Sequence, residues 1–235
     1  MHPPRLGVVV ALDAEARALY PGPVSHDTVL AIDTRMLLRI SGMGWVRAAA
    51  AARQLIAAGA DGLVSWGTAG ALERSLRPGD LLLPEEVLWK RQKWAVHAHW
   101  REALAQSLPM PVHGGGILSV VTPCATALAK STIRLEHASA QGVDMESGAI
   151  AAVAHAAGKP FVVLRSIVDP AAQSLPVSAT GGVDAYGRPQ VMALLRGLLR
   201  HPVELRDLLR LGGQMRAALK TLQAAAPALG AGMPV

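Results

Sequence analysis

Short, mostly apolar runs recur along this chain, and they restrict its fold more than any other feature. The clearest are Leu6–Leu12, Asp61–Gly67 and Pro160–Val168. Such runs are typical of strands that are covered on both faces. Alanine-rich segments with a helical pattern, Gly44–Ala58 and Met145–Ala157, alternate with them. We therefore expect an α/β fold of three layers (α/β/α), in which helices cover both faces of a central sheet.

Further strands are expected between these segments. Thr28–Gly42 predicts a hairpin that turns at Asp33 and Thr34, which would make the sheet mixed. Asp80–Val87 predicts one strand and Gly116–Val121 another. Pro170–Pro189 is expected to be a loop that could act as a lid.

One domain is enough for a chain of 235 residues, and we expect it to span residues 1–223. Its last part, residues 190–223, places leucine and arginine at helical spacing and predicts a helical C-terminal region. Residues 224–235 are rich in alanine and glycine and contain two prolines, so they are expected to form a disordered tail.

The charge and cysteine content restrict the partners and the compartment. Lysine and arginine number 23 against 17 acidic residues. This excess would suit nucleic acid, an anionic membrane surface or an anionic substrate, but an arginine-rich composition without such a partner explains it better. The tryptophans do not interleave with basic residues, so we expect no nucleic-acid binding. A single cysteine, Cys124, the lack of a signal peptide and the lack of a long apolar span predict a cytoplasmic protein.

Two glycine-containing stretches follow expected strands, where open α/β sheets bind ligands. One is Gly42–Arg47, G-M-G-W-V-R, which lacks the third glycine of a dinucleotide fingerprint. Its glycines would let the backbone at Met43 approach a ligand, although a tight turn alone would explain them. The other is Gly67–Leu72, G-T-A-G-A-L, which would equally suit a turn without a ligand.

Three acidic residues stand at the edges of the expected core. Glu15 follows the first strand, Glu146 precedes an alanine-rich helix, and Asp169 ends the last buried strand. Taken singly, the two glutamates could favour helix starts and Asp169 an Asp-Pro turn. His97 and His99 could face one way on a strand, but no partner at metal-ligand spacing supports a metal site.

Taken in order, four stretches resemble the purine nucleoside phosphorylases and the related methylthioadenosine/adenosylhomocysteine nucleosidases. They are G-V-V-V-A-L-D-A-E, S-G-M-G-W-V-R-A-A-A-A, V-S-W-G-T-A-G-A-L with L-R-P-G-D-L-L-L-P, and V-D-M-E-S-G-A-I with F-V-V-L-R-S-I-V-D. Together they span about Leu6 to Pro170, and the combination is far more specific than any one motif. The resemblance implies the nucleoside phosphorylase fold and cleavage of an N-glycosidic bond.

The resemblance also implies roles for individual residues. Asp169 would give a proton to N7 of a leaving adenine, and Glu15 would orient and deprotonate the attacking water. Glu146 would accept hydrogen bonds from the ribose hydroxyls. The remaining substrate-binding residues would line the pocket for the base and the sugar: Met43, Thr68, Ala69, Gly70 and Met145. No metal and no organic cofactor is expected.

Departures from the family pattern bear on the reaction and on the substrate. A carboxylate at Glu15, where many phosphorylases carry a phosphate loop, favours hydrolysis, although Arg39 and Arg47 could still build an anion site. The ending V-D-P-A…L-P and the Leu/Arg-rich tail resemble the hopanoid-associated branch, which implies removal of adenine from adenosylhopane and a tail that could touch the inner membrane surface.

The alternatives are a small-nucleoside nucleosidase for methylthioadenosine or adenosylhomocysteine, a phosphate-dependent phosphorylase, and a non-catalytic module that binds purines or lipids. The resemblance further implies a homo-oligomer.

Overall fold

The computed structural model describes residues 5–176, 184–188 and 204–231. Within them, eleven strands form one mixed sheet. The strands are β1 (Leu6–Val10), β2 (Leu30–Ala31), β3 (Met36–Ile40), β4 (Gly62–Ala71), β5 (Leu81–Leu82), β6 (Glu86–Trp89), β7 (Gln92–Ala95), β8 (Val112–His113), β9 (Gly116–Ser119), β10 (Ala140–Asp144) and β11 (Phe161–Ile167).

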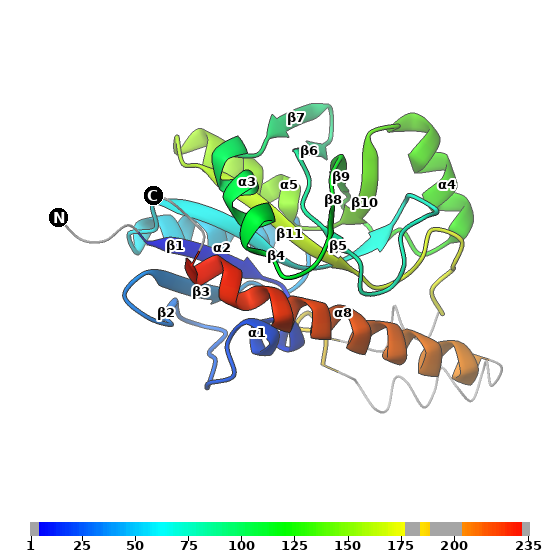
Figure 1. The fold of residues 1–235 in the computed structure, drawn as a ribbon, viewed down its shortest axis with the longest axis horizontal. Coiled ribbons are helices and arrows are strands. Elements are labelled where there is room, and N and C mark those ends of the chain that lie inside the picture. Colours follow the sequence, from blue (N-terminus) through cyan, green and yellow to red (C-terminus); the bar gives the residue numbers. More distant parts are fainter. Residues whose placement is uncertain (1–4, 177–183, 189–203, 232–235) are drawn as a thin grey trace.

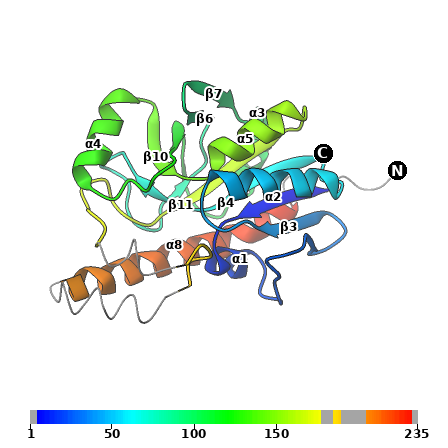
Figure 2. The ribbon, with the colours of Figure 1, turned by 180° about the vertical axis from the view of Figure 1, so that it is seen from behind.

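Helices cover both faces of this sheet, as the sequence predicted. They are α1 (Asp13–Leu19), α2 (Trp45–Ala57), α3 (Ala98–Ser107), α4 (Ala127–Glu136), α5 (Ser147–Ala156) and α8 (Leu205–Ala231). The long helix α8 lies over one face together with α1 and α3 (Figure 1). Seen from behind, α2 and α5 lie side by side on the opposite face (Figure 2). The expected three-layer arrangement is therefore confirmed.

Strand β4 is the centre of the sheet. It pairs in parallel with β1 along one edge and with β11 along the other, and its last two residues, Gly70 and Ala71, pair with β10. Strand β3 pairs in parallel with β1. Because parallel strands end at the same edge of a sheet, the segments that follow β1, β3 and β11 meet beside the second half of β4.

The structure differs from the predicted elements at two strands. The stretch Gly67–Leu72 was expected to leave the sheet, but β4 continues to Ala71 because β11 and β10 supply hydrogen-bonding partners. The single strand predicted over Asp80–Val87 is two strands, β5 and β6, which pair with different neighbours. Pro84, which has no amide hydrogen to donate, lies between them.

The C-terminal end also differs from the prediction. Residues 224–231, expected to be disordered, belong to α8. Ala225, Ala228 and Leu229 are buried in the main core, and this packing outweighs the break in hydrogen bonding at Pro227. Residues 190–203 and 232–235 lie outside the described residues. None of the helices in the described part of the chain combines the length and apolar character that crossing a bilayer requires.

Candidate active site

Glu15 is fixed at the start of α1, directly after β1. Its Oε2 atom accepts hydrogen bonds from the backbone amides of Ala11 (3.2 Å) and Leu12 (3.0 Å). Its Oε1 atom accepts from the amide of Thr68 (2.8 Å) and from the Thr68 hydroxyl (2.9 Å). With only 1% of its surface exposed, the carboxylate is held between α1 and β4 by four donors.

Gly67 allows this close approach. A Cβ atom at position 67 would lie 2.7 Å from Oε1 of Glu15 and 2.5 Å from Nη1 of Arg165. Real Cβ atoms do not come so near to such groups, so any larger residue would displace the carboxylate or the guanidinium. Gly67, which belongs to a stretch singled out from the sequence, is therefore needed because it leaves room for Glu15 and Arg165.

Arg165 lies in the middle of β11 and is fully buried. Its Nη2 atom is 2.8 Å from Oδ2 of Asp144 and 3.6 Å from Oε2 of Glu146, and it donates to the Ser65 hydroxyl at 2.9 Å. Burial alone would lower the pKa of Arg165, but the charges of Asp144, Glu146 and Glu15 raise it. The guanidinium therefore stays charged and serves three carboxylates, which we call the Arg165 cluster: Arg165, Glu15, Asp144 and Glu146.

Glu146 joins this cluster to the turn after β3. Its Oε1 atom accepts a hydrogen bond from the amide of Gly44 at 2.8 Å. Burial raises the pKa of Glu146 to about 7, against the attraction of Arg165, and the charge of Asp144 adds to the rise. Near neutral pH this carboxyl group can therefore both donate and accept hydrogen bonds. Gly44 has φ of 98°, a conformation that favours glycine and turns its amide toward the carboxyl group.

Asp169, after the end of β11, has a cation of its own. Its Oδ2 atom forms an ion pair with Nζ of Lys130 in α4, whose side chain is completely buried. Lys130 Nζ also donates to the carbonyl oxygens of Pro170 (2.8 Å) and Gln173 (3.0 Å). The carboxylate lies against β4, because a Cβ atom at Gly70 would be 3.1 Å from its Oδ2 atom.

A comparison with protein families identifies the superfamily of this chain. The family model of the phosphorylase superfamily matches residues 28–200, which is most of the chain. The chain belongs to the phosphorylase superfamily. The matched range includes Thr68, Glu146 and Asp169, whereas Glu15 lies before it. A search among curated proteins gives no match.

Solved structures share their fold with nearly all of this chain. A 5′-methylthioadenosine/S-adenosylhomocysteine nucleosidase from Neisseria meningitidis, in complex with methylthio-immucillin-A, is 20% identical with a TM-score of 0.68, covering 95% of this chain and 98% of its own. Futalosine hydrolase of Helicobacter pylori is 16% identical with a TM-score of 0.68, covering 97% and 96%. The methylthioadenosine/S-adenosylhomocysteine nucleosidase of Helicobacter pylori is 16% identical with a TM-score of 0.70, covering 98% and 97%.

Hydrogen bonds connect several of the residues singled out from the sequence, either directly or through their neighbours in the chain. Thr68 contacts Glu15, and its carbonyl oxygen accepts from Nη1 of Arg165 at 3.4 Å. Ala69 accepts a hydrogen bond from the amide of Val168, next to Asp169. The half-buried side chains of Met43 and Met145 precede Gly44 and Glu146, which are bonded to each other.

Sequence reasoning assigned no role to three residues of this site: Arg165, Asp144 and Lys130. Arg165 interrupts an apolar strand, and a charge in such a place requires a partner, so this signal was present. Asp144 immediately precedes Met145 and Glu146 and holds the start of α5 through the amide and hydroxyl of Ser147. Lys130 gave no signal, because a lysine on an amphipathic helix usually faces solvent.

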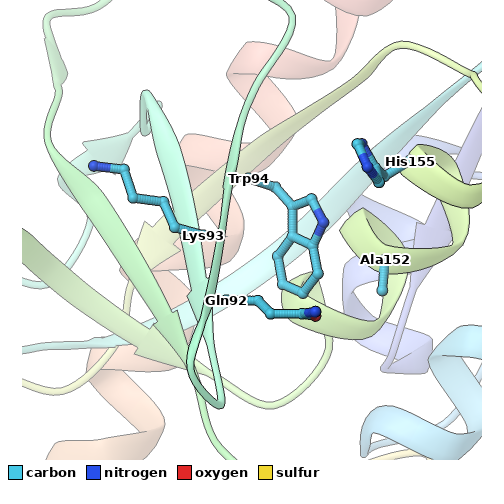
Figure 3. A pocket seen from close by; sticks show the side chains of 5 residues that line it. All are labelled: Gln92, Lys93, Trp94, Ala152 and His155. Carbon is cyan, nitrogen blue, oxygen red and sulfur yellow. The ribbon is translucent and has the colours of Figure 1, made fainter.

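Two hollows in the described part of the chain lie away from the Arg165 cluster. One of about 450 Å³ is lined by β7 and by Ala152 and His155 of α5. In Figure 3 the side chain of Lys93 extends away from the others around this hollow. Glu146 lies at the opposite end of α5. A second hollow, of about 600 Å³, lies between α4, the end of β4 and Ala171, which is two residues from Asp169.

His97 and His99, for which the sequence supported no metal site, are not on a strand. His97 caps α3 by accepting a hydrogen bond from the amide of Trp100, and His99 is within that helix. Among the described residues, no group of three or more potential ligands is arranged to hold a metal ion.

Proposed function

We propose that this protein is a nucleosidase that hydrolyses the N-glycosidic bond of an adenine nucleoside. The observation that carries the proposal is the placement of three buried carboxyl groups, Glu15, Glu146 and Asp169, around the second half of β4. Two of the solved structures with this fold are named as nucleosidases of 5′-methylthioadenosine and S-adenosylhomocysteine, and both of these compounds are adenine nucleosides. Binding alone would not require three carboxyl groups at this edge, which disfavours a non-catalytic module.

Each carboxyl group has a distinct task in the proposed reaction. Asp169 protonates N7 of the leaving adenine, so that the base departs neutral as the sugar gains oxocarbenium character. Glu146 binds the ribose hydroxyls, for which its pKa of about 7 provides both donor and acceptor character. Glu15 orients the attacking water and takes its proton. The base and the sugar lie against Thr68, Ala69, Gly70, Met43 and Met145.

The contacts of the arginines favour water over phosphate as the nucleophile. Arg39 is occupied, since its Nε atom donates to Gln54 (2.6 Å) and its Nη1 atom to the carbonyl of Ile40 (2.7 Å). Arg165 already serves three carboxylates, and Glu15 would repel an anion beside them. Arg47 is exposed and is the cation left for a phosphate-dependent alternative.

For the 5′ substituent we propose hopane, making adenosylhopane the substrate and adenine and ribosylhopane the products. The resemblance of the chain's ending to the hopanoid-associated branch motivates this choice. The hollow beside Ala171 adds to it, because Leu128 and Leu135 of α4 line it and are 77% and 85% exposed. Exposed apolar side chains of this size suit a hydrocarbon. A small soluble nucleoside such as methylthioadenosine is the second candidate.

The decisive experiment measures adenine release from adenosylhopane in detergent and from methylthioadenosine and adenosylhomocysteine, each with and without phosphate. Rapid, phosphate-independent release from adenosylhopane alone is expected. Release only from the small nucleosides would replace the hopane substituent with a small one, and strict dependence on phosphate would make the protein a phosphorylase. No adenine from any of the three would overturn the nucleosidase proposal.

A further inference from the structure

Lys130 is the residue of this site that the proposed chemistry leaves unexplained. Its side chain is 0% exposed, although burial strongly disfavours the charged form of an amine. Three acceptors compensate for this cost: Oδ2 of Asp169 and the carbonyl oxygens of Pro170 and Gln173. An ammonium group has three hydrogens, so each acceptor receives one.

The same three contacts would also satisfy an uncharged lysine. A neutral amine has two hydrogens and one lone pair, which match the two carbonyl oxygens and a protonated Asp169. Moving one proton from Lys130 to Asp169 would therefore leave no buried polar group of the pair without a partner. Within the described part of the chain, no donor is bonded to the other carboxylate oxygen, Oδ1 of Asp169. In the proposed reaction, this is the oxygen left to contact a ligand.

An ion-paired aspartate has no proton to give, yet the proposed reaction requires one for the base. We propose that Lys130 stores this proton and supplies it to the leaving base through Asp169, an inference that rests on the proposed nucleosidase function. Lys130 is thus a positioning residue for Asp169 and the source of its proton.

The transfer balances in two steps. First, an Nζ–H bond of Lys130 breaks, its electron pair stays on nitrogen, and the proton binds Oδ2 of Asp169. Then the carboxyl group turns about its soft Cβ–Cγ bond and gives the proton to N7 of the purine. As N7 is protonated, the glycosidic bond breaks and its electrons stay on the base. Water adds to the sugar and gives up a proton to Glu15, which later releases it to solvent. The amine of Lys130 regains a proton from solvent after the base has left.

Two other titratable side chains of the described residues lie near the pair, Cys124 and Arg134, and neither can replace Lys130 as the proton donor. Burial raises the pKa of the Cys124 thiol, with the Lys130 charge acting in the opposite direction and Asp169 adding to the rise, so this group stays a neutral thiol. Arg134, one turn further along α4, is engaged with Glu73 at 2.9 Å. A guanidinium in any case does not give up its proton in proteins.

A change of leaving group can test whether Lys130 supplies a proton or only supports the structure of the site. Adenine requires a proton to depart, whereas p-nitrophenol leaves as a stable anion. The two substrates are the adenine nucleoside that the wild-type protein cleaves best and the p-nitrophenyl riboside with the same 5′ substituent. Lys130→Met is expected to lower kcat for adenine release by about 100-fold or more. Its rate on the p-nitrophenyl riboside should stay near that of the wild type. Lys159→Met is the matched control and should preserve both rates, because Lys159 pairs with Asp61 (3.5 Å) just before β4, at the far end of that strand from the site.

Two further variants keep the test decisive if Lys130→Met folds poorly. Lys130→Arg retains the charge but not the transferable proton, so it should lose adenine release and keep p-nitrophenyl riboside hydrolysis. In the Asp169→Asn background, adding Lys130→Met should lower adenine release no further, because Lys130 acts through Asp169. That double variant has no buried charge left unpaired in this pair.

Several outcomes would overturn the inference without touching the proposed function. One is an equal loss on both substrates in Lys130→Met and Lys130→Arg, which would make Lys130 a structural support. Another is full adenine release by Lys130→Arg. By contrast, a wild-type protein that releases adenine from no nucleoside would overturn the proposed function itself.

Discussion

The two ends of the site neutralise their carboxylates in different ways. In the Arg165 cluster one cation serves three carboxylates, and all four groups are buried. In the Lys130–Asp169 pair, one cation serves one carboxylate and two backbone carbonyls. The cluster therefore has an excess of negative charge, which contributes to the raised pKa of Glu146, whereas the pair is balanced. An unbalanced buried cluster should be sensitive to pH and to loss of its cation, and a balanced pair should respond chiefly to the position of one proton.

The largest expected effect is that of removing the shared cation. Arg165→Met would leave Asp144 and Glu146 buried without an opposite charge, and we expect the free energy of unfolding to fall by about 3–5 kcal/mol. Urea denaturation followed by circular dichroism would measure it. Arg188→Met is the matched control, since Arg188 pairs with Asp13 at 2.7 Å but is 53% exposed. Its loss should cost far less than that of Arg165, because solvent screens an exposed ion pair. Similar losses in the two variants would contradict the role assigned to Arg165.

The next effect is a pH dependence of stability that belongs to Glu146. Its pKa is raised from 4.5 to about 7 in the folded protein, so the folded state holds this proton more tightly than the unfolded state. Its contribution is fully present below pH 4.5 and is lost as the pH rises to 7, which amounts to up to about 3 kcal/mol.

Unfolding free energies of the wild type and Glu146→Gln, measured across this range, should therefore diverge as the pH rises, with the variant less sensitive. The exposed Glu136→Gln serves as the control and should follow the wild type. Parallel curves for the wild type and Glu146→Gln would show that the excess negative charge of this cluster does not control how the free energy of unfolding depends on pH.

A smaller effect is expected from filling the space that the cluster needs. Gly67→Ala would place a methyl group 2.5 Å from Arg165 and 2.7 Å from Glu15, which we expect to cost about 1–3 kcal/mol and to lower adenine release by displacing the carboxylate. Gly212→Ala is the control, because nothing lies within 4 Å of that position in α8. It should leave activity unchanged and raise stability by up to about 1 kcal/mol. Thermal unfolding and the adenine assay, applied to both variants, would decide whether Gly67 is required for space.

The smallest expected effect concerns a single donor to Glu15. Thr68→Val removes the hydroxyl that donates to Oε1 at 2.9 Å, and we expect a stability loss of about 1 kcal/mol with a lower kcat. Thr221→Val removes a comparable hydroxyl, which donates to the carbonyl of Gly79 at 2.7 Å in a remote place. The two variants should lose similar stability, but only Thr68→Val should lose activity. An equal effect on kcat would mean that Glu15 does not depend on Thr68.

Most of the fold could be predicted because the hydrophobic pattern of each segment agrees with the way in which that segment packs in the tertiary structure. The apolar runs at β1 and β11 are buried on both faces, and the alanine-rich segments at α2 and α5 each bury alanines against the core. Composition and pattern therefore indicate these elements. The second half of β4 could not be predicted, since Thr68, Ala69 and Gly70 have the composition of a turn. They stay in the sheet only because distant strands pair with them.

The site could be predicted in part for the same reason. Glu15, Glu146 and Asp169 each stand at the end of a segment whose fold is evident, and the sequence indicates their position. The cation that each carboxylate receives comes from elsewhere in the fold. Lys130 is 39 residues from Asp169 in the sequence, and nothing in α4 marks it as buried rather than exposed. Which of these carboxyl groups carries a proton depends on its paired cation, and the tertiary structure decides that pairing.

The backbone hydrogen bonds to the two glutamates give the molecule a natural spectroscopic probe. The amide of Gly44 donates to Glu146, and the amide of Thr68 donates to Glu15. An amide proton shifts strongly when the carboxylate that it contacts gains or loses a proton. In a ¹⁵N-labelled sample these two resonances would therefore record the ionisation of each glutamate separately, during a pH titration or on addition of a substrate analogue, in a protein with no substitution and no attached label.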